Sequence, residues 1–286
     1  MKSICIKTTN QKTISYLLEK LKNFELEDVY YSYKKFKIYD NIIIHFKGKN
    51  KKLFLKHVSV LLASLIIDLF EQNILKYLVK SEYFYFDTIE QKQIVNNTFD
   101  DLYNLEESIQ KPADRLNILS DSFYTYLLSH HSIYLKGFIT FRLKNYLEIL
   151  LEQIDKSVNK YIIEKEYTEF ISLLKIYIGS EPPACNLIHL IYSNNKPILL
   201  DEYKNLIDTN TDIFNAKYLS DISFSSNDYT LNTLLNLVPK KIYIHLIDNK
   251  ADEFINTLKL IFEDRIIFCN DCSICKIYKK SPAIQS

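Results

Sequence analysis

Glycine is scarce in this chain, and its scarcity excludes several common ligand-binding motifs. The 286 residues include three glycines, Gly48, Gly137 and Gly179, which lie far apart. Phosphate-binding loops and dinucleotide fingerprints need clustered glycines where the backbone approaches a phosphate. The sequence also lacks the H-E-x-x-H and G-x-S-x-G motifs. It therefore contains no complete catalytic signature and predicts no nucleotide cofactor.

Long apolar runs and a targeting segment are lacking as well. The longest uncharged apolar run covers residues 58–67 and is ended by Asp68, whereas a transmembrane helix needs about 20 such residues. The first ten residues, MKSICIKTTN, show no basic stretch followed by the apolar core of a signal peptide. We therefore expect no transmembrane segment and a cytoplasmic location.

Net charge is nearly absent, at +1, which gives no global reason to expect nucleic acid or acidic partners. Hydrophobic residues make up 47% of the chain and charged residues 25%, a balance typical of soluble globular proteins. Tryptophan is missing and Ile, Lys, Asn and Tyr are abundant, which we interpret as codon bias of an AT-rich genome. The length allows two domains or one large domain.

Residues 1–110 predict a mixed α/β region, and residues 111–180 predict a central helical bundle. The first region contains apolar patterns typical of strands and helices, with a turn expected at Asp40-Asn41. The predicted strands are 3–8, 29–33, 36–39 and 42–46, and the predicted helices are 11–21, 53–79, 89–108, 114–128, 133–154 and 163–178. Gly179 and Pro182-Pro183 end the last helix and mark the best domain boundary.

Residues 181–286 predict a C-terminal α/β domain. A β-hairpin is expected over residues 187–200, and Ser225-x-x-Asp228 resembles a capping box before the helix 231–237. Strand 242–247, helix 251–262 and strand 266–269 form a β-α-β unit, which normally makes its two strands parallel. The predicted fold class is therefore α+β, ending in a β-hairpin and a β-α-β unit.

Three cysteines with the spacing C-x2-C-x2-C form the densest group of potentially reactive side chains in the sequence. Cys269, Cys272 and Cys275 follow the last predicted strand, and His245 lies near the carboxyl end of its partner strand. Adjacent parallel strands would bring these four side chains to the sheet edge where ligands usually bind. Thiols stay reduced in the cytosol, so a metal or redox site is more plausible than structural disulfides.

The chemistry of this cluster has several interpretations. Cys3His is an accepted ligand set for tetrahedral zinc. Three cysteines also suit an iron–sulfur cluster, but the ferredoxin pattern is incomplete because Lys279 stands four residues after Cys275. Thiol redox chemistry and inert free thiols are the remaining alternatives.

A lysine-rich segment, Lys34–Lys56, is a second candidate site. It contains eight lysines, among them Lys49 and Lys51, against one acid, Asp40, and aromatic residues are interleaved with them. Such a segment suits a nucleic-acid backbone or an anionic membrane surface. The structural alternative is a lysine-decorated hairpin edge that resists pairing with another edge.

Arg142 is a third candidate, because it interrupts an apolar stripe between Phe138 and Tyr146. A buried guanidinium needs an anionic or carbonyl partner, so we expect either an internal ion pair with a glutamate such as Glu164 or Glu166, or an anion clamp. Other histidines and cysteines favour structural roles: His130-His131 at a polar helix end, His189 on a strand face, and Cys5 and Cys185 as small buried residues.

Several of these segments resemble one known family. The stretch Gly137-Phe138-Ile139-x-Phe141-Arg142-Leu143-Lys144-x-Tyr146 resembles the signature of the YtxC-like family of sporulation proteins. The similarity continues through residues 164–174, 199–201 and 231–245 and closes on the three cysteines. It covers most of residues 133–275, whereas the first 110 residues match in length and general character.

This resemblance implies a cytoplasmic protein of endospore-forming bacteria that is linked to sporulation, and it implies no reaction. Two hypotheses follow. The chain is a non-enzymatic accessory protein that acts through an unknown protein partner, or it is a metal-dependent or redox protein that uses His245 and the cysteines. Nucleic-acid binding through Lys34–Lys56 is a weaker third hypothesis.

Overall fold

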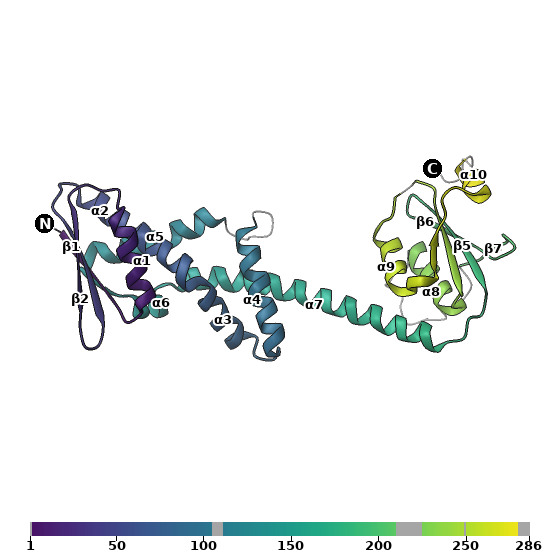
Figure 1. Cartoon of the computed structure of the whole chain (residues 1–286), viewed down its shortest axis with the longest axis horizontal. Coiled ribbons are helices and arrows are strands. Elements are labelled where there is room, and N and C mark those ends of the chain that lie inside the picture. The colour runs from purple at the N-terminus through teal and green to yellow at the C-terminus, as the bar shows by residue number, and fades with distance from the viewer. Residues whose placement is uncertain (1, 105–110, 210–224, 249, 280–286) are drawn as a thin grey trace. The chain divides into compact units, whose positions relative to one another are not determined.

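The computed structural model describes residues 2–104, 111–209, 225–248 and 250–279, and the fold is α+β, as the sequence predicts (Figure 1). The chain divides into two compact units, residues 1–163 and 164–286. The elements that begin in the first unit are β1 (Lys2–Thr8), α1 (Gln11–Lys22), β2 (Val29–Lys35), β3 (Asp40–Phe46), α2 (Lys51–Leu65), a π-helical segment (Ile66–Phe70), α3 (Glu71–Glu82), α4 (Thr88–Tyr103), α5 (Pro112–Ser129), β4 (Ser132–Tyr134), α6 (Leu135–Arg142) and α7 (Lys144–Ser180).

The second unit takes the C-terminal part of α7 and a series of shorter elements. These are β5 (Leu187–Ser193), β6 (Lys196–Leu200), β7 (Leu206–Ile207), α8 (Ser226–Leu237), β8 (Lys241–Leu246), α9 (Glu253–Phe262), a 3-10 turn (Glu263–Arg265), β9 (Ile266–Phe268) and α10 (Ser273–Lys279).

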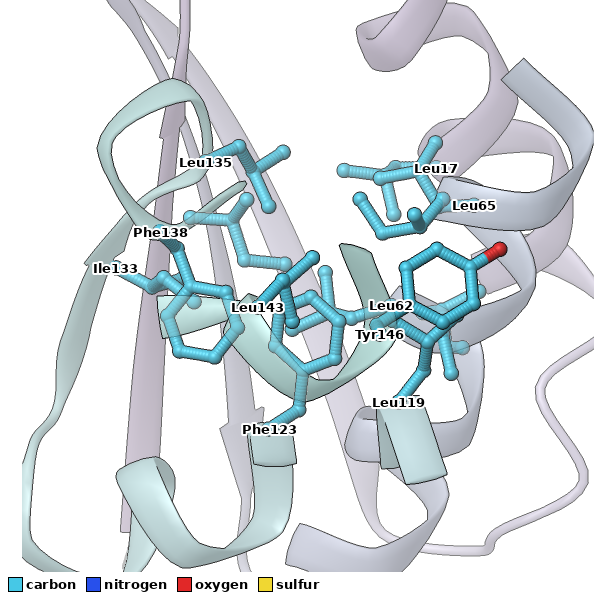
Figure 2. Packing of buried hydrophobic residues seen from close by; sticks show 14 of the residues in the cluster. Leu17, Leu62, Leu65, Leu119, Phe123, Ile133, Leu135, Phe138, Leu143 and Tyr146 are labelled. Atoms are coloured by element: carbon cyan, nitrogen blue, oxygen red, sulfur yellow. The ribbon is translucent and has the colours of Figure 1, made fainter. Parts of the chain in front are cut away.

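The first unit packs helices against one face of a four-stranded sheet of order β2-β3-β1-β4. Alternate residues of β1 and β3, such as Ile4, Ile6, Ile42 and Ile44, are fully buried on that face. Leu17 of α1 and further apolar side chains from α2, α5, α6 and α7 close the core, as Figure 2 shows. The apolar side chains that alternate along the strands and those that repeat with helical spacing therefore belong to one hydrophobic core.

The strand pattern at β2 and β3 differs from the prediction. Residues 36–39 form the hairpin loop instead of a strand, and Asp40 opens β3 instead of a turn. The pairing register, Lys35 opposite Asp40, leaves those four residues between the two strands. The side chains of Phe36 and Ile38 are 51% and 78% exposed, so these two apolar residues are not part of the core of this unit.

Two of the predicted long helices are interrupted. The helix expected over residues 53–79 runs as α2 and α3 on either side of the π-helical turn Ile66–Phe70. The helix expected over residues 133–154 begins as the short strand β4, which pairs in parallel with β1 through Ser132 opposite Cys5. It then breaks again at Leu143, between α6 and α7. Apolar periodicity does not reveal such interruptions, because residues on both sides keep helical spacing.

The second unit contains a five-stranded sheet of order β7-β6-β5-β8-β9. The predicted hairpin is present, and both residues of its turn, Asn194 and Asn195, have positive φ, as tight hairpins favour. The β-α-β unit is confirmed because β8 and β9 pair in parallel, and β5 also pairs in parallel with β8. The capping box at Ser225 is present at the start of α8.

The two faces of this sheet are covered differently. One face carries Ile188, Leu190, Ile242 and Ile244, which pack with α8, α9 and Ile178 of α7 in the main core of the unit. The opposite face holds a small second cluster, built from Ile191, Leu200 and Ile274. Because Ile274 belongs to α10, this short helix covers part of the second face.

The two units divide the chain differently from the three regions expected from the sequence. Residues 2–104 and 111–163 share one core, because α5 packs along α2 and Phe123 of α5 belongs to the same buried cluster as Phe54 of α2. Helix α7 passes through Gly179 to Ser180, so the proline pair follows the helix while the unit boundary falls inside it, at 163/164. The sequence marks where a helix ends, but it does not show which core each half of a long helix joins.

The helical stretch Lys51–Glu82 is long and apolar enough to cross a membrane by length and composition. Half of its most apolar window is buried inside the first unit, where Phe54, Leu62 and Leu75 are fully buried. Core helices pass the same test of length and composition, so this stretch is weak evidence for a membrane span.

Candidate metal centre

Four side chains that can bind a metal meet in the second unit. They are His245, Cys269, Cys272 and Cys275, and their ligand atoms all lie within 4.8 Å of one another. The structure thus brings together the four residues that the sequence grouped.

Each candidate ligand is placed by a strand, a strand end or a helix start. His245 is the fifth residue of β8, and Cys269 directly follows β9. The Cys269 N–H donates to the Ile244 carbonyl at 2.9 Å, which extends the parallel pairing to the cysteine. The chain then turns through Asp271, whose φ of 109° lies outside the range usual for non-glycine residues.

The turn delivers the other two thiols to the start of α10. The Cys272 carbonyl accepts a helical hydrogen bond from the Lys276 N–H at 3.1 Å, and Cys275 lies in the first turn of the helix. Cys272 and Cys275 are three residues apart, so they share one face of α10. The C-x2-C-x2-C spacing therefore combines a strand end, a tight turn and a helix start.

Four of the six distances between the candidate ligand atoms match the edges of a single tetrahedral site, and all six are within 4.8 Å. The Cys275 Sγ lies 3.8 Å from Cys269 Sγ and 3.9 Å from Cys272 Sγ. The His245 Nδ1 lies 3.3 Å from Cys275 Sγ and 3.5 Å from Cys272 Sγ. Zinc bonds of about 2.3 Å to sulfur and about 2.0–2.1 Å to nitrogen imply tetrahedral edges of roughly 3.8 Å between sulfurs and roughly 3.5 Å from sulfur to nitrogen.

Burial and nearby hydrogen-bonding groups shift the pKa of three of these side chains. Burial lowers the pKa of His245 to about 4, with a further contribution from His189, so the imidazole is neutral near pH 7. Burial raises the pKa of Cys275 to about 11. Burial opposes ionisation of Cys272, but backbone N–H groups of Cys275 and Ile274 and the Cys269 thiol outweigh it and lower its pKa.

A second histidine lies next to His245, on the side of its ring opposite the sulfurs of Cys272 and Cys275. His189 of β5 places its Nδ1 3.0 Å from the Nε2 of His245, and its ring packs near Tyr243 at 5.7 Å between centroids. Burial lowers the pKa of His189, and Lys204 adds to the effect. The sequence predicted a strand-face role for His189 and did not connect it with His245, because 56 residues separate the two.

Arg142 differs from the expected buried guanidinium. It is exposed, and among the described residues it has no ion pair with Glu164 or Glu166 within 4.0 Å. It is the last residue of α6, next to the helix break at Leu143, and it lines a surface pocket of about 590 Å³ together with His130 and Asn145.

The buried arginine of the first unit is Arg115, which the sequence analysis did not single out. Its Nε lies 3.6 Å from Glu71 Oε1, and neither side chain is exposed. Tyr103 donates a hydrogen bond to Glu71 Oε2 at 3.0 Å, and Tyr146 donates to Oε1. These residues lie on four different helices, so spacing along the sequence could not reveal the network.

The lysine-rich segment is split by the fold. All eight lysines are exposed, but Lys34, Lys35 and Lys37 lie at the loop end of the β2–β3 hairpin. Lys47, Lys49, Lys51, Lys52 and Lys56 follow from the opposite end of β3 into α2. Seven residues of β3 separate the groups, which is roughly 20 Å of strand. The local charge is therefore shared between two places instead of forming one continuous patch.

The remaining candidates occupy ordinary structural positions. His130 caps the end of α5 and stacks on Tyr126, and His131 follows it at the same helix end. Cys5 and Cys185 are partly buried, and burial raises the pKa of both thiols.

Comparison with known proteins gives the family. A family model described as the YtxC-like family matches residues 56–267, most of the chain. The chain belongs to the YtxC-like family. The Bacillus subtilis (strain 168) protein named "Uncharacterized protein YtxC" is 21% identical over 195 residues, which are 66% of this chain and 68% of that protein. No solved structure matches the chain.

The matched range differs in two ways from the extent expected from motifs. It begins at residue 56, so it includes most of α2 and all of α3 and α4 in addition to the signature around Arg142. It ends at residue 267, two residues before Cys269. His245 of the YtxC-like chain thus lies inside the family match, and the three thiols lie beyond it.

Proposed function

We propose that His245, Cys269, Cys272 and Cys275 hold one tetrahedral zinc ion, and that this ion fastens α10 to the C-terminal sheet. The observation that carries the proposal is the agreement between the four atom separations of 3.3–3.9 Å and the edges of a zinc tetrahedron.

The same distances favour one ion over an iron–sulfur cluster. In a cluster the ligands bind different irons, so they stand further apart than ligands of a single ion. Here every ligand atom lies within 4.8 Å of every other. The incomplete ferredoxin pattern after Cys275 points the same way.

Four protein ligands favour a structural site. Catalytic zinc sites keep one position open for water or substrate, whereas structural sites are closed by four side chains. His245 is 1% exposed and Cys275 is 3% exposed, so the ion would be shielded on that side. Three thiolates and one Zn²⁺ leave one net negative charge, near which α10 carries Lys276 and Lys279.

Helix α10 needs such a link. It has seven residues, and isolated helices of fewer than about 12 residues are marginal in water. Its apolar contacts with the sheet are small, because its own Ile274 meets two buried side chains of the sheet, Ile191 and Leu200, in this cluster. A metal that bridges β8, the end of β9 and α10 would supply the missing stabilisation.

At the cellular level we propose a non-enzymatic accessory role in sporulation, in the cytoplasm and through a protein partner. The support is membership of the YtxC-like family, which the sequence resemblance links to sporulation, together with four candidate ligands that would leave no coordination position open for a substrate. A strain that carries Cys272→Ser should form fewer spores, and counts of heat-resistant spores would test this.

Elemental analysis tests the metal centre directly. Full-length protein purified without chelator and with thiols kept reduced should contain about one zinc per chain, because Cys3His sites bind zinc tightly near neutral pH. Cys272→Ser should lower the zinc content severalfold. Cys185→Ser is the matched control, since Cys185 lies in the same unit outside the ligand group, and it should keep the zinc.

Two results would contradict the proposal. One is wild-type protein without stoichiometric metal, which would leave thiol redox chemistry or inert thiols as explanations of the cysteines. The other is iron together with acid-labile sulfide, which would indicate a cluster instead of a single ion.

A further inference from the structure

His189 occupies the position that an outer ligand of the metal centre would take. It shares with His245 the sheet face that α10 covers, because Ile191 pairs with His245 and His189 pairs with Tyr243 in the parallel register of β5 and β8. The His245 ring therefore lies between two groups. Its Nδ1 faces the sulfurs of Cys272 and Cys275, and its Nε2 faces His189 Nδ1 at 3.0 Å.

The hydrogen bond between the histidines has one polarity that is compatible with a metal. A neutral imidazole carries one N–H, and the nitrogen that binds a metal must offer a lone pair. If His245 binds through Nδ1, its proton is on Nε2 and donates to His189 Nδ1. His189 then accepts with that nitrogen and carries its own proton on Nε2.

We propose that His189 is the positioning residue of the metal centre: by accepting the Nε2–H of His245, it selects the tautomer that presents Nδ1 to the ion and holds the ring in that orientation. This inference rests on the proposed function. Metal-binding histidines usually donate their second N–H to such a partner, and removing the partner typically lowers metal affinity about 10–100-fold.

A matched pair of substitutions separates positioning from packing. In asparagine the Oδ1 stands the same number of bonds from the backbone as His189 Nδ1, so His189→Asn keeps an acceptor at that position. Leucine has nearly the same shape as asparagine but places a methyl group there, so His189→Leu removes the acceptor. Both variants lose the imidazole ring that packs near Tyr243.

The experiment measures Zn²⁺ affinity of the full-length variants by competition with a chromogenic chelator. His189→Leu should bind zinc about 10–100-fold more weakly than wild type, and His189→Asn should lose less than tenfold. With Co²⁺ as the probe, the visible ligand-field bands should change in the leucine variant and stay close to wild type in the asparagine variant.

The outcomes distinguish this inference from the metal centre itself. If wild-type protein binds one Zn²⁺ and the two variants bind it equally well, or leucine binds it more tightly, His189 has a packing role and the positioning inference is wrong. If the wild-type protein binds no Zn²⁺, both the metal centre and its positioning residue are overturned. An affinity loss confined to the leucine variant supports both.

Discussion

Glu71 begins α3 without any exposure to solvent, and its partners come from three other helices. Arg115 supplies the countercharge, and Tyr103 and Tyr146 donate hydrogen bonds to its two oxygens. The Arg115 Nη1 also donates to the Leu102 carbonyl at 2.6 Å. A buried carboxylate is tolerated when its charge and lone pairs are satisfied in this way, and the arrangement joins α3, α4, α5 and α7 at one point.

Removing this carboxylate should destabilise the first unit strongly. We expect Glu71→Ala to lower the free energy of unfolding by about 3–5 kcal/mol, because it removes the buried carboxylate that Arg115, Tyr103 and Tyr146 contact. Urea denaturation followed by circular dichroism measures the change.

The control for this prediction is Glu82→Ala on the same helix. Glu82 is exposed, so its loss should change stability by less than about 0.5 kcal/mol. Replacing both Glu71 and Arg115 by leucine should recover much of the loss, since both partners of this buried ion pair are then replaced by apolar side chains. Equal stabilities of Glu71→Ala and wild type would show that the network contributes little.

At the scale of elements, α9 connects β8 and β9, the strands at whose ends His245 and Cys269 lie. It crosses between β8 and β9, and its buried residues Ile255, Leu258 and Ile261 pack on the main face of the sheet. Asp252 starts the helix by accepting the Ile255 N–H at 3.1 Å, and it also accepts the hydroxyl of Tyr192 at the end of β5. One side chain therefore ties the helix start to the sheet.

Loss of this helix cap should weaken the second unit. We expect Asp252→Ala to lower its stability by about 1–2 kcal/mol, the usual range for an N-cap aspartate. Asp252→Asn keeps an oxygen that can cap the helix and should stay within about 0.5 kcal/mol of wild type. Hydrogen exchange of the α9 amides measures both, and similar exchange in the two variants would argue against the capping role.

Elements whose pattern is local could be predicted well from the sequence, and the others could not. The turn Asn194-Asn195, the capping box at Ser225 and the strand of His245 depend on neighbouring residues, and the structure contains all three. Helix α10 was not predicted, because seven residues carry little periodicity and its burial depends on a sheet face built elsewhere in the chain. Strand β4 was missed for the same reason, since its partner β1 lies more than 120 residues away.

At the scale of the whole molecule, the described residues form a separate main core in each unit, and the second unit adds the small cluster of Ile191, Leu200 and Ile274. The proposed ion belongs to the second unit alone, because all four candidate ligands and His189 lie in residues 164–286. A ligand that binds the folded state stabilises the part that forms its site. The effect of metal removal should therefore be confined to the second unit.

Chelation tests this expectation in the intact protein. After treatment with a zinc chelator, hydrogen exchange should become faster in β8, β9 and α10, while the amides of α2 and α5 should keep their protection. Mass spectrometry of peptides before and after treatment, with zinc added back as the control, measures the difference. Faster exchange throughout the first unit would mean that metal loss acts on more than its own site.

The sequence by itself determined the α+β class, the family resemblance, the β-α-β unit and the grouping of His245 with three cysteines, because each depends on spacing or on local propensity. Tertiary structure decided that Arg115 and not Arg142 is the buried arginine, that the lysines are divided, and that His189 stands behind His245. Those facts depend on contacts between residues far apart in the chain. Such contacts depend on which apolar faces of the elements pack together, and local sequence patterns do not show which faces these are.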